Sequence, residues 1–178
     1  FELVDDCMSI FTLKCHEEKL VFFSSISSDT PTLLIGDGNR IKQVLVNLLS
    51  NATKFTHEGE VNLYITRLSE SKDSASLSFS IHDTGSGIRK ETLKTLFSSI
   101  EQLDNAKSDF QLSSIAMTLC KQLVALMGGE LYVESTLGLG STFSFSLPYR
   151  FADQLEEKES PIELLQGLSV LIVDDNST

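Results

Sequence analysis

The feature that constrains this chain most is an apolar arc of helical period followed directly by two segments of strand period. Within residues 39–55, apolar side chains recur at steps of three and four, as on one face of an α-helix, and Asp37 is placed to cap its start. Residues 60–68 and 75–82 alternate apolar and polar side chains, as half-buried strands do, and a serine-rich stretch joins them. We therefore expect a helix packed on a sheet that contains this hairpin. The arc consists of Ile41, Val44, Leu45, Leu48, Leu49, Ala52 and Phe55.

The remaining segments extend both layers. The pattern predicts an amphipathic helix in residues 1–18, a strand in 19–26 and a turn or loop at 29–31. After the hairpin it predicts a short helix, a polar segment without periodicity, a longer helix ended by a glycine pair, and a final hairpin that Pro148 closes. These four elements are assigned to residues 90–100, 101–109, about 114–127, and 131–134 with 142–147. The predicted fold class is an α/β (α+β) two-layer sandwich, with a mixed, mainly antiparallel sheet covered on one face by helices.

The composition changes near the C-terminal end. An acidic, proline-containing stretch follows Tyr149, and an apolar run at residues 168–173 then ends in Asp174 and Asp175. Such a run is typical of the first parallel strand of another α/β domain. Because the chain starts at Phe1 without a methionine, we expect a fragment of a longer protein. We predict one domain at residues 1–150, a linker at 151–166 and the truncated start of a second domain at 167–178.

Charge and cysteine content exclude several classes of function. A formal net charge of −11 argues against a nucleic-acid surface, which requires clustered Lys and Arg. No apolar run approaches the roughly 20 residues that span a bilayer. Cys7, Cys15 and Cys120 are odd in number and lack the spacing of a zinc site, which favours reduced thiols.

A first candidate motif is a polar stripe on the helix at residues 39–55. Asn47, Asn51 and Lys54 lie four and three positions apart, so they share one helix face roughly opposite the apolar arc. An Asn oxygen can contact Mg²⁺ bound to phosphates, and a Lys supplies a compact positive charge for phosphate oxygens. The alternative is an ordinary solvent-exposed helix face.

A second candidate motif follows the strand at residues 75–82. It reads Asp83-Thr-Gly-Ser-Gly-Ile88, which places a carboxylate at a strand end beside Gly85 and Gly87. Glycine allows close backbone approach, and the carboxylate can accept a hydrogen bond from an exocyclic amine. Asp and Gly are also the commonest turn formers, so a plain turn is the alternative.

Together, in this order and with a hairpin between them, the two motifs resemble the ATP-binding domain of histidine kinases and related gyrase-type ATPases, over about residues 1–150. Residues 168–175 resemble the start of a receiver domain, so the parent protein is similar to a hybrid kinase. The matching segments are residues 37–56 for the N-box, 83–88 for the first glycine box, Phe97 with Gln102 and Asp104 for the F-box, 121–129 for the helix after the nucleotide lid, and 138–148 for the closing hairpin.

On the phosphate side, the resemblance implies roles for three residues of the N-box. Asn51 would coordinate Mg²⁺, Lys54 would contact phosphate, and Asn47 would occupy the neighbouring polar position with a catalytic role. The implied cofactors are Mg²⁺ and ATP or ADP.

On the adenine side, the resemblance implies that Asp83 accepts from the adenine amino group. Gly85 and Gly87 would let the backbone approach the nucleotide. The remaining implied nucleotide contacts are Phe55, Ile88 and Thr142.

The nucleotide lid departs from the family pattern. The GTGLGL segment of the family falls on residues 112–117, so all three glycines are replaced, and no glycine remains between Gly87 and Gly128. Those glycines let backbone N–H groups wrap the phosphates. We therefore expect weakened triphosphate binding, with the adenine side better preserved. The F-box positions Ser99 and Ile100 also differ, and Lys107 is the nearest basic residue to the lid.

The three histidines are weaker candidates. His16 begins a His-Glu-Glu sequence like that of a phosphoacceptor, but a surface position on the first helix is favoured by its place in the chain. For His57 and His82 a solvated or hydrogen-bonded role is favoured over a catalytic one.

The resemblance implies the ATP-binding catalytic domain of a two-component hybrid sensor histidine kinase, which would pass a phosphoryl group to a histidine on a separate dimerisation domain. The implied partners are those dimerisation helices and a receiver domain, with no nucleic acid and no direct membrane contact. The domain would be cytoplasmic and its parent anchored in the inner membrane. The replaced glycines leave enzymatic activity open, and the alternative is a degenerate domain with weak or no ATP binding that regulates a partner kinase by docking.

Overall fold

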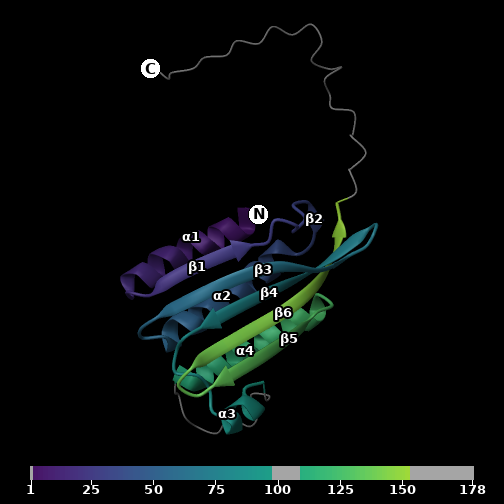
Figure 1. The fold of residues 1–178 in the computed structure, drawn as a ribbon. Helices are drawn as coiled ribbons and strands as arrows, with labels where there is room; N and C mark the ends of the chain where they lie inside the picture. Colours follow the sequence, from purple (N-terminus) through teal and green to yellow (C-terminus); the bar gives the residue numbers. More distant parts are fainter. Residues whose placement is uncertain (1, 98–108, 153–178) are drawn as a thin grey trace, which may run out of the picture.

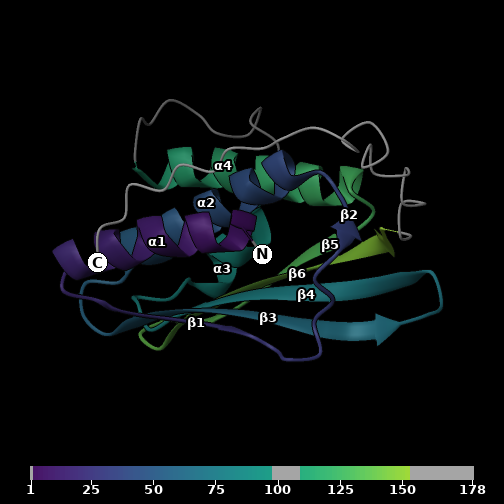
Figure 2. The ribbon, with the colours of Figure 1, turned by 90° about the horizontal axis from the view of Figure 1, so that it is seen from above.

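The protein folds into two layers (Figures 1 and 2). The computed structural model describes residues 2–97 and 109–152. Three helices cover one face of a six-stranded sheet, and the short α3 (Lys90–Thr95) lies at one end of the sheet. The covering helices are α1 (Glu2–Glu17), α2 (Gly38–Phe55) and α4 (Asp109–Leu126). The predicted two-layer sandwich is confirmed.

The sheet is mixed and mainly antiparallel, as predicted. Its strand order is β1-β3-β4-β6-β2, and β5 pairs with β6 as well. Only β1 runs parallel to its neighbour, β3, among the described pairings. The strands are β1 (Val21–Ile26), β2 (Leu34–Ile35), β3 (Glu60–Glu70), β4 (Ser74–Asp83), β5 (Glu130–Thr136) and β6 (Gly140–Phe151).

The core lies between the three covering helices and the sheet, with α2 at its centre. The apolar arc of α2 is buried from Ile41 to Ala52, and the Asp37 side chain caps the helix by accepting from the Arg40 N–H at 3.1 Å. On the sheet, Phe79 and Phe145 stack with ring centroids 4.8 Å apart. Each fully buried large apolar side chain of this kind contributes roughly 1.5–3 kcal/mol. The core therefore fixes α2 against β4 and β6, the elements that frame the site described below.

Several boundaries differ from the predictions. The predicted loop after β1 contains the short strand β2, which pairs with β6 through Leu34↔Phe151 and Ile35↔Arg150. β6 continues through Pro148, which was predicted to end the domain. It tolerates this proline because β5 pairs with β6 only as far as Ser146 and β2 begins at Arg150, so one side of Pro148 has no strand partner that needs an N–H. α4 begins at Asp109, five residues before its predicted start.

Several predictions fall outside the described residues. These are the non-periodic segment at 101–108, the F-box positions Ser99, Ile100, Gln102 and Asp104, Lys107, the predicted linker from residue 153 on, and the start of the second domain. The short helix predicted at 90–100 ends earlier, at Thr95, and Phe151, predicted to start the linker, belongs to β6. In the part of the chain that is described, no helix is long and apolar enough to span a membrane. Cys7, Cys15 and Cys120 are buried free thiols, as expected.

Candidate functional site

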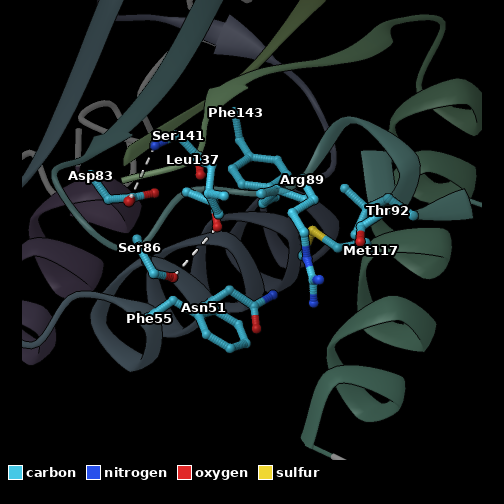
Figure 3. Close-up of a pocket in the computed structure, with 14 residues that line it drawn as sticks. Asn51, Phe55, Asp83, Ser86, Arg89, Thr92, Met117, Leu137, Ser141 and Phe143 are labelled. Carbon is cyan, nitrogen blue, oxygen red and sulfur yellow. Dashed lines mark hydrogen bonds between the residues drawn. The ribbon is translucent and has the colours of Figure 1, made fainter. Parts of the chain in front are cut away.

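A pocket opens between the C-terminal end of α2, the loop after β4, and the helices α3 and α4 (Figure 3). Its volume is about 380 Å³, within the range of small-molecule sites. Most of its surface is apolar, with a few polar groups that converge on it. The lining residues are Asn51, Ala52, Phe55, Asp83, Ser86, Gly87, Ile88, Arg89, Thr92, Leu96, Met117, Leu137, Ser141 and Phe143.

The most buried polar residue in the pocket lining is Asp83. Asp83 is only 3% exposed, and its Oδ1 accepts the N–H of Gly85 at 2.9 Å and of Ser141 at 3.3 Å. Burial raises the pKa of this carboxyl, while the two backbone donors oppose that shift. Both donors reach the same oxygen, and Oδ2 accepts no hydrogen bond among the described residues. One carboxylate oxygen is thus oriented by the protein while the other can accept from a ligand.

The glycines of the loop after β4 are required by close backbone contacts within the protein. A Cβ on Gly85 would lie 2.3 Å from the Phe55 carbonyl oxygen, and a Cβ on Gly87 would lie 2.1 Å from the Thr136 carbonyl oxygen. Gly87 also has a φ of 64°, which favours glycine. The Ser86 N–H donates to the Phe55 carbonyl at 3.1 Å, which ties the loop to the end of α2. Gly87 lines the pocket, whereas Gly85 lies outside its lining, packed against the end of α2.

Of the N-box residues with an implied nucleotide or Mg²⁺ contact, Asn51 and Phe55 lie in the pocket. Figure 3 shows their side chains next to each other on α2, with the Arg89 side chain beside Asn51. Ile88 lines the pocket as well. The structure thus gathers Asn51, Phe55, Asp83, Gly87 and Ile88 around one space, although they come from separate elements.

The structure places Asn47, Lys54 and Thr142 outside the lining of this pocket. Asn47 faces α4, where its amide donates to the buried Cys120 Sγ at 3.6 Å. Burial raises the pKa of this thiol to about 11. The exposed Lys54 ammonium lies 5.6 Å from the centre of the Phe55 ring. Thr142 points to the opposite face of the sheet, because it stands between the inward-facing Ser141 and Phe143 on a strand.

On that opposite face, Thr142 shares a hydrogen bond of 3.0 Å with His82. Of the two roles expected for His82, solvated or hydrogen-bonded, the structure shows the hydrogen-bonded one.

The segment that aligns with the glycine lid is helical. Residues 112–117 lie inside α4, where Ser114 is 2% exposed and donates to the Leu96 carbonyl at 3.2 Å. Met117, from the same segment, forms part of the pocket wall. Backbone N–H groups in a helix interior are used by intrahelical bonds. This segment therefore meets the pocket with side chains, whereas a glycine lid would offer backbone donors.

Sequence reasoning missed several lining residues, of which Arg89 is the most informative. Arg89 immediately precedes α3. Figure 3 shows its side chain beside Met117 at the mouth of the pocket, which Asn51 also lines. The strand alternation at β6 could have identified Ser141 and Phe143. For Arg89 the sequence offers no signal, because the direction of a residue before a short helix depends on how that helix packs.

The residues present fit a nucleotide with a phosphate-bound cation. Asp83 Oδ2 suits an amino group, Phe55 and Ile88 supply apolar walls, and Arg89 supplies a positive charge at the mouth. Mg²⁺ is usually held by few protein ligands together with substrate phosphates. Asn51 offers one such neutral oxygen.

Comparison with known proteins gives consistent matches. Residues 36–150 match the family described as "Histidine kinase-, DNA gyrase B-, and HSP90-like ATPase". The chain is 37% identical over 173 residues to the sensor histidine kinase GacS of Pseudomonas protegens, covering 96% of this chain and 19% of that protein. It is 34% identical over 148 residues to the hybrid signal transduction histidine kinase B of Dictyostelium discoideum, covering 83% of this chain and 8% of that protein.

Among solved structures, full-length ShkA in complex with AMPPNP is similar, with a TM-score of 0.68 and 28% identity. The match covers 85% of this chain and 30% of that one. The chain thus spans about a fifth of the length of GacS and less than a tenth of the Dictyostelium relative.

Proposed function

Since the chain belongs to the family of histidine kinase-, DNA gyrase B- and HSP90-like ATPases, we propose that its pocket binds ATP or ADP with the adenine beside Asp83. The observation that carries the proposal is the buried Asp83 carboxylate, which has one oxygen fixed by two backbone donors and the other open to a ligand. Adenine presents an exocyclic amine that this second oxygen can accept from. The match to the family and to hybrid sensor histidine kinases does not favour the alternative of a docking domain without nucleotide.

The adenine end of the proposed site is preformed. Phe55 and Ile88 provide apolar walls, and the loop that carries Gly85 and Gly87 is fastened to α2 and to the turn between β5 and β6. A preformed, mostly apolar pocket binds a flat aromatic base at low cost in ordering entropy.

The phosphate end relies on side chains. Because residues 112–117 are helical, we propose that the positive charge of Arg89 and the amide of Asn51 contact the phosphates and their Mg²⁺, with Lys54 close by on α2. Arg and Lys make such contacts through long, flexible side chains, which lose conformational entropy when a ligand orders them. Triphosphate affinity should therefore exceed that of the nucleoside only modestly.

The activity of the whole protein follows as a proposal from its relatives. We propose that this domain delivers the γ-phosphoryl group of Mg-ATP to a histidine on separate dimerisation helices, chiefly by positioning and charge neutralisation. A receiver domain would follow it in the same chain, at residues 167–178 and beyond. Because the similar proteins include a sensor kinase, we place the parent in the cell membrane and this domain in the cytoplasm.

Calorimetric titration tests the proposal. The chain is titrated with Mg-ADP, with Mg-AMPPNP and with adenosine. We expect all three to bind, with ADP and AMPPNP in the micromolar range and differing little from each other. Failure of all three, in a sample that unfolds cooperatively, would refute nucleotide binding; binding of phosphate-containing ligands without adenosine would refute the role of Asp83.

A further inference from the structure

Strand β1 forms one edge of the sheet. Among the described strands β3 is its one neighbour, and Figure 1 shows β1 at the margin of the sheet with α1 alongside it. The Val21 N–H donates to the Gly59 carbonyl at 2.9 Å, and the Ser27 N–H donates to the Ile65 carbonyl at 2.9 Å. The odd-numbered residues of this segment therefore point their backbone groups toward β3.

The even-numbered residues of β1 offer their backbone groups to the free edge, because successive residues of a strand point these groups in opposite directions. The N–H and C=O groups of Phe22, Ser24 and Ile26 form this row, and none of them bonds to another described residue. A row of unpaired backbone groups at strand spacing is complementary to the backbone of another extended segment. The chemistry of the edge thus specifies a polypeptide in β conformation.

This edge lacks the features that protect most edge strands from pairing. Protected strands are usually very short, charged, bulged or interrupted by proline. The six residues of β1, VFFSSI, include no charged residue and no proline. Their pairing with β3 runs from Val21 to Ile26 without a register shift. β1 is therefore a regular strand whose outer side is open to pairing.

Apolar side chains lie beside the free edge on both faces of the sheet. On the open face, Val21 is 62% exposed and Phe23 is 50% exposed, and the Phe23 ring centroid lies 6.0 Å from that of Tyr64 on β3. On the helix-covered face, Phe22 and Ile26 are only partly buried. An added strand would cover these side chains, which favours apolar residues at its centre.

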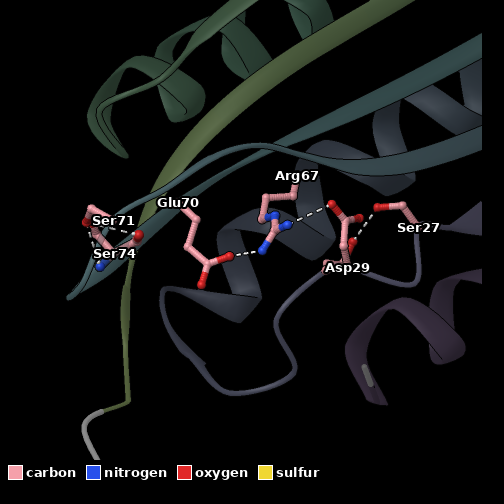
Figure 4. Close-up of polar contacts among 7 residues, drawn as sticks. Ser27, Asp29, Arg67, Glu70, Ser71 and Ser74 are labelled. Carbon is pink, nitrogen blue, oxygen red and sulfur yellow. Dashed lines mark hydrogen bonds and ion pairs between the residues drawn. The ribbon is translucent and has the colours of Figure 1, made fainter.

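A polar network fastens the segment that follows β1 (Figure 4). Arg67 on β3 pairs with Asp29 at 3.0 Å and with Glu70 on its own strand. Ser27 hydrogen-bonds to Asp29 and, at 2.8 Å, to Thr30. These contacts tie the end of β1 to β3, so the edge is preformed before a partner arrives.

The charges around the start of β1 favour a basic partner. Four carboxylates and one lysine lie in the end of α1, the residues after it and the turn into β3. They are Glu17, Glu18, Glu58, Glu60 and Lys19. Complementary charge across an interface steers association and selects the partner. The added segment should therefore carry Lys or Arg at its ends.

A second copy of this chain fits the edge less well than a lone strand. Antiparallel pairing of two β1 strands would place both α1 helices on the same face of one continuous sheet. Paired strands lie about 4.8 Å apart, whereas packed helices need about 8–10 Å between their axes. Because α1 packs on β1 at the margin of the sheet, the two helices would overlap (Figures 1 and 2).

We propose that the free edge of β1 binds an extended segment of a partner protein, which joins the sheet as an additional antiparallel strand. The segment has β-branched or other apolar residues at its centre and Lys or Arg at its ends. Main-chain hydrogen bonds supply the affinity, and the alternating side chains supply the specificity. β3 separates this edge from the strands β4 and β6 that line the nucleotide pocket, so the site does not depend on nucleotide binding.

Hydrogen exchange of the chain, followed by NMR with the capped peptide KKVTVTVKK, tests the proposal. With peptide at about ten times its dissociation constant, exchange of the Phe22, Ser24 and Ile26 amides should slow about tenfold, because about a tenth of the protein stays free. The exposed amide of Lys72, in the turn between β3 and β4, should keep its rate. Binding that leaves the three edge amides unprotected would overturn the proposal, as would no binding.

Two altered peptides test the backbone and the charge separately. The same peptide with N-methyl groups on its five central residues cannot donate from its backbone and should bind at least about tenfold more weakly. The peptide EEVTVTVEE keeps the alternation, reverses the charge and should bind about tenfold more weakly. Undiminished binding of the methylated peptide would refute strand addition, and undiminished binding of the acidic peptide would refute a basic partner.

A matched pair of variants tests the edge itself. Ser24→Pro removes one N–H from the free edge without breaking a bond to β3, and should weaken binding about fivefold or more. Ser24→Ala keeps that N–H and should bind as wild type does. Equal affinities, in variants that both unfold cooperatively, would overturn the proposal; if the proline variant does not fold, the methylated peptide decides. Dimerisation of the chain that the peptide reverses would assign the edge to a second copy instead.

Discussion

Replacing Asp83 by asparagine should reverse the base preference of the nucleotide pocket. The Gly85 and Ser141 N–H groups both need an acceptor at the position of Oδ1, so the amide oxygen of the introduced asparagine should take that place. Its NH₂ group then replaces Oδ2 and faces the proposed position of the adenine amine, donor against donor. A 6-oxo purine presents a carbonyl there and can accept from the amide.

The size of the effect follows from the bonds that change. A hydrogen bond to a charged group contributes about 1.5–3 kcal/mol, and leaving a buried donor without an acceptor costs about 1–3 kcal/mol. Their sum predicts that ADP affinity falls by roughly 100-fold or more, at about 1.4 kcal/mol per factor of ten. Both backbone hydrogen bonds remain, so the free energy of unfolding should change by no more than about 1 kcal/mol.

The assay is calorimetric titration of wild type and Asp83→Asn with ADP and with IDP. Wild type should prefer ADP, and the variant should prefer IDP. Asp73→Asn, an exposed position in the turn before β4, makes the same change in charge and should leave both affinities unchanged. Retention of the wild-type preference for ADP by Asp83→Asn would refute the placement of adenine at Oδ2.

Three further predictions follow from the described residues. Arg89→Gln should weaken binding of ATP by about tenfold but leave adenosine unchanged, as measured by calorimetry, whereas the exposed neighbour Lys90→Gln should change neither; an equal loss for adenosine would contradict a phosphate role. Gly87→Ala should lower the free energy of unfolding, measured in urea, by about 3 kcal/mol or more, because Gly87 has a positive φ and an added Cβ would collide with the Thr136 carbonyl. Gly138→Ala should lower it by only about 1 kcal/mol, because Gly138 also has a positive φ but an added Cβ there would meet no atom. Equal losses would disprove the steric argument. The raised pKa of Asp83 means that its contribution to stability is fully present below its unfolded pKa of about 4 and is lost as pH rises through the folded value. Urea unfolding from about pH 3.5 to 7, a range that brackets the unfolded pKa, should therefore show the stability of wild type minus that of Asp83→Asn decreasing with pH, and an increase would contradict the burial argument.

Local pattern was sufficient for most of the elements. The arc from Ile41 to Ala52 identified α2 and its buried face, and Asp37 was correctly assigned as its cap. The alternation in β3 and β4 gave the inward residues, such as Leu63 and Ile81. These predictions succeeded because a helix or strand with one buried face must repeat its apolar residues at its own period.

Parts of the candidate site were also visible locally. Asp83 and Gly87 are close in the chain, and their chemistry depends on a strand end and a tight loop that a short motif encodes. The functional assignments of the site residues remain proposals, but the structure brings Asn51, Phe55, Asp83, Gly87 and Ile88 to one pocket.

The sequence alone determined most of the helices and strands, the faces that they bury, and that a carboxylate stands at a strand end beside glycines, but it missed the two-residue strand β2. Tertiary structure alone decided that β1 runs parallel to β3, that Asn47 contacts Cys120, that Arg89 lies at the mouth of the pocket and that the Tyr149 hydroxyl has no hydrogen-bond partner among the described residues. The physical reason is the separation along the chain between the residues that come into contact. Periodicity records only whether a side chain faces the core, whereas its partner there comes from an element distant in the chain, and that choice is made by packing the whole set of elements together.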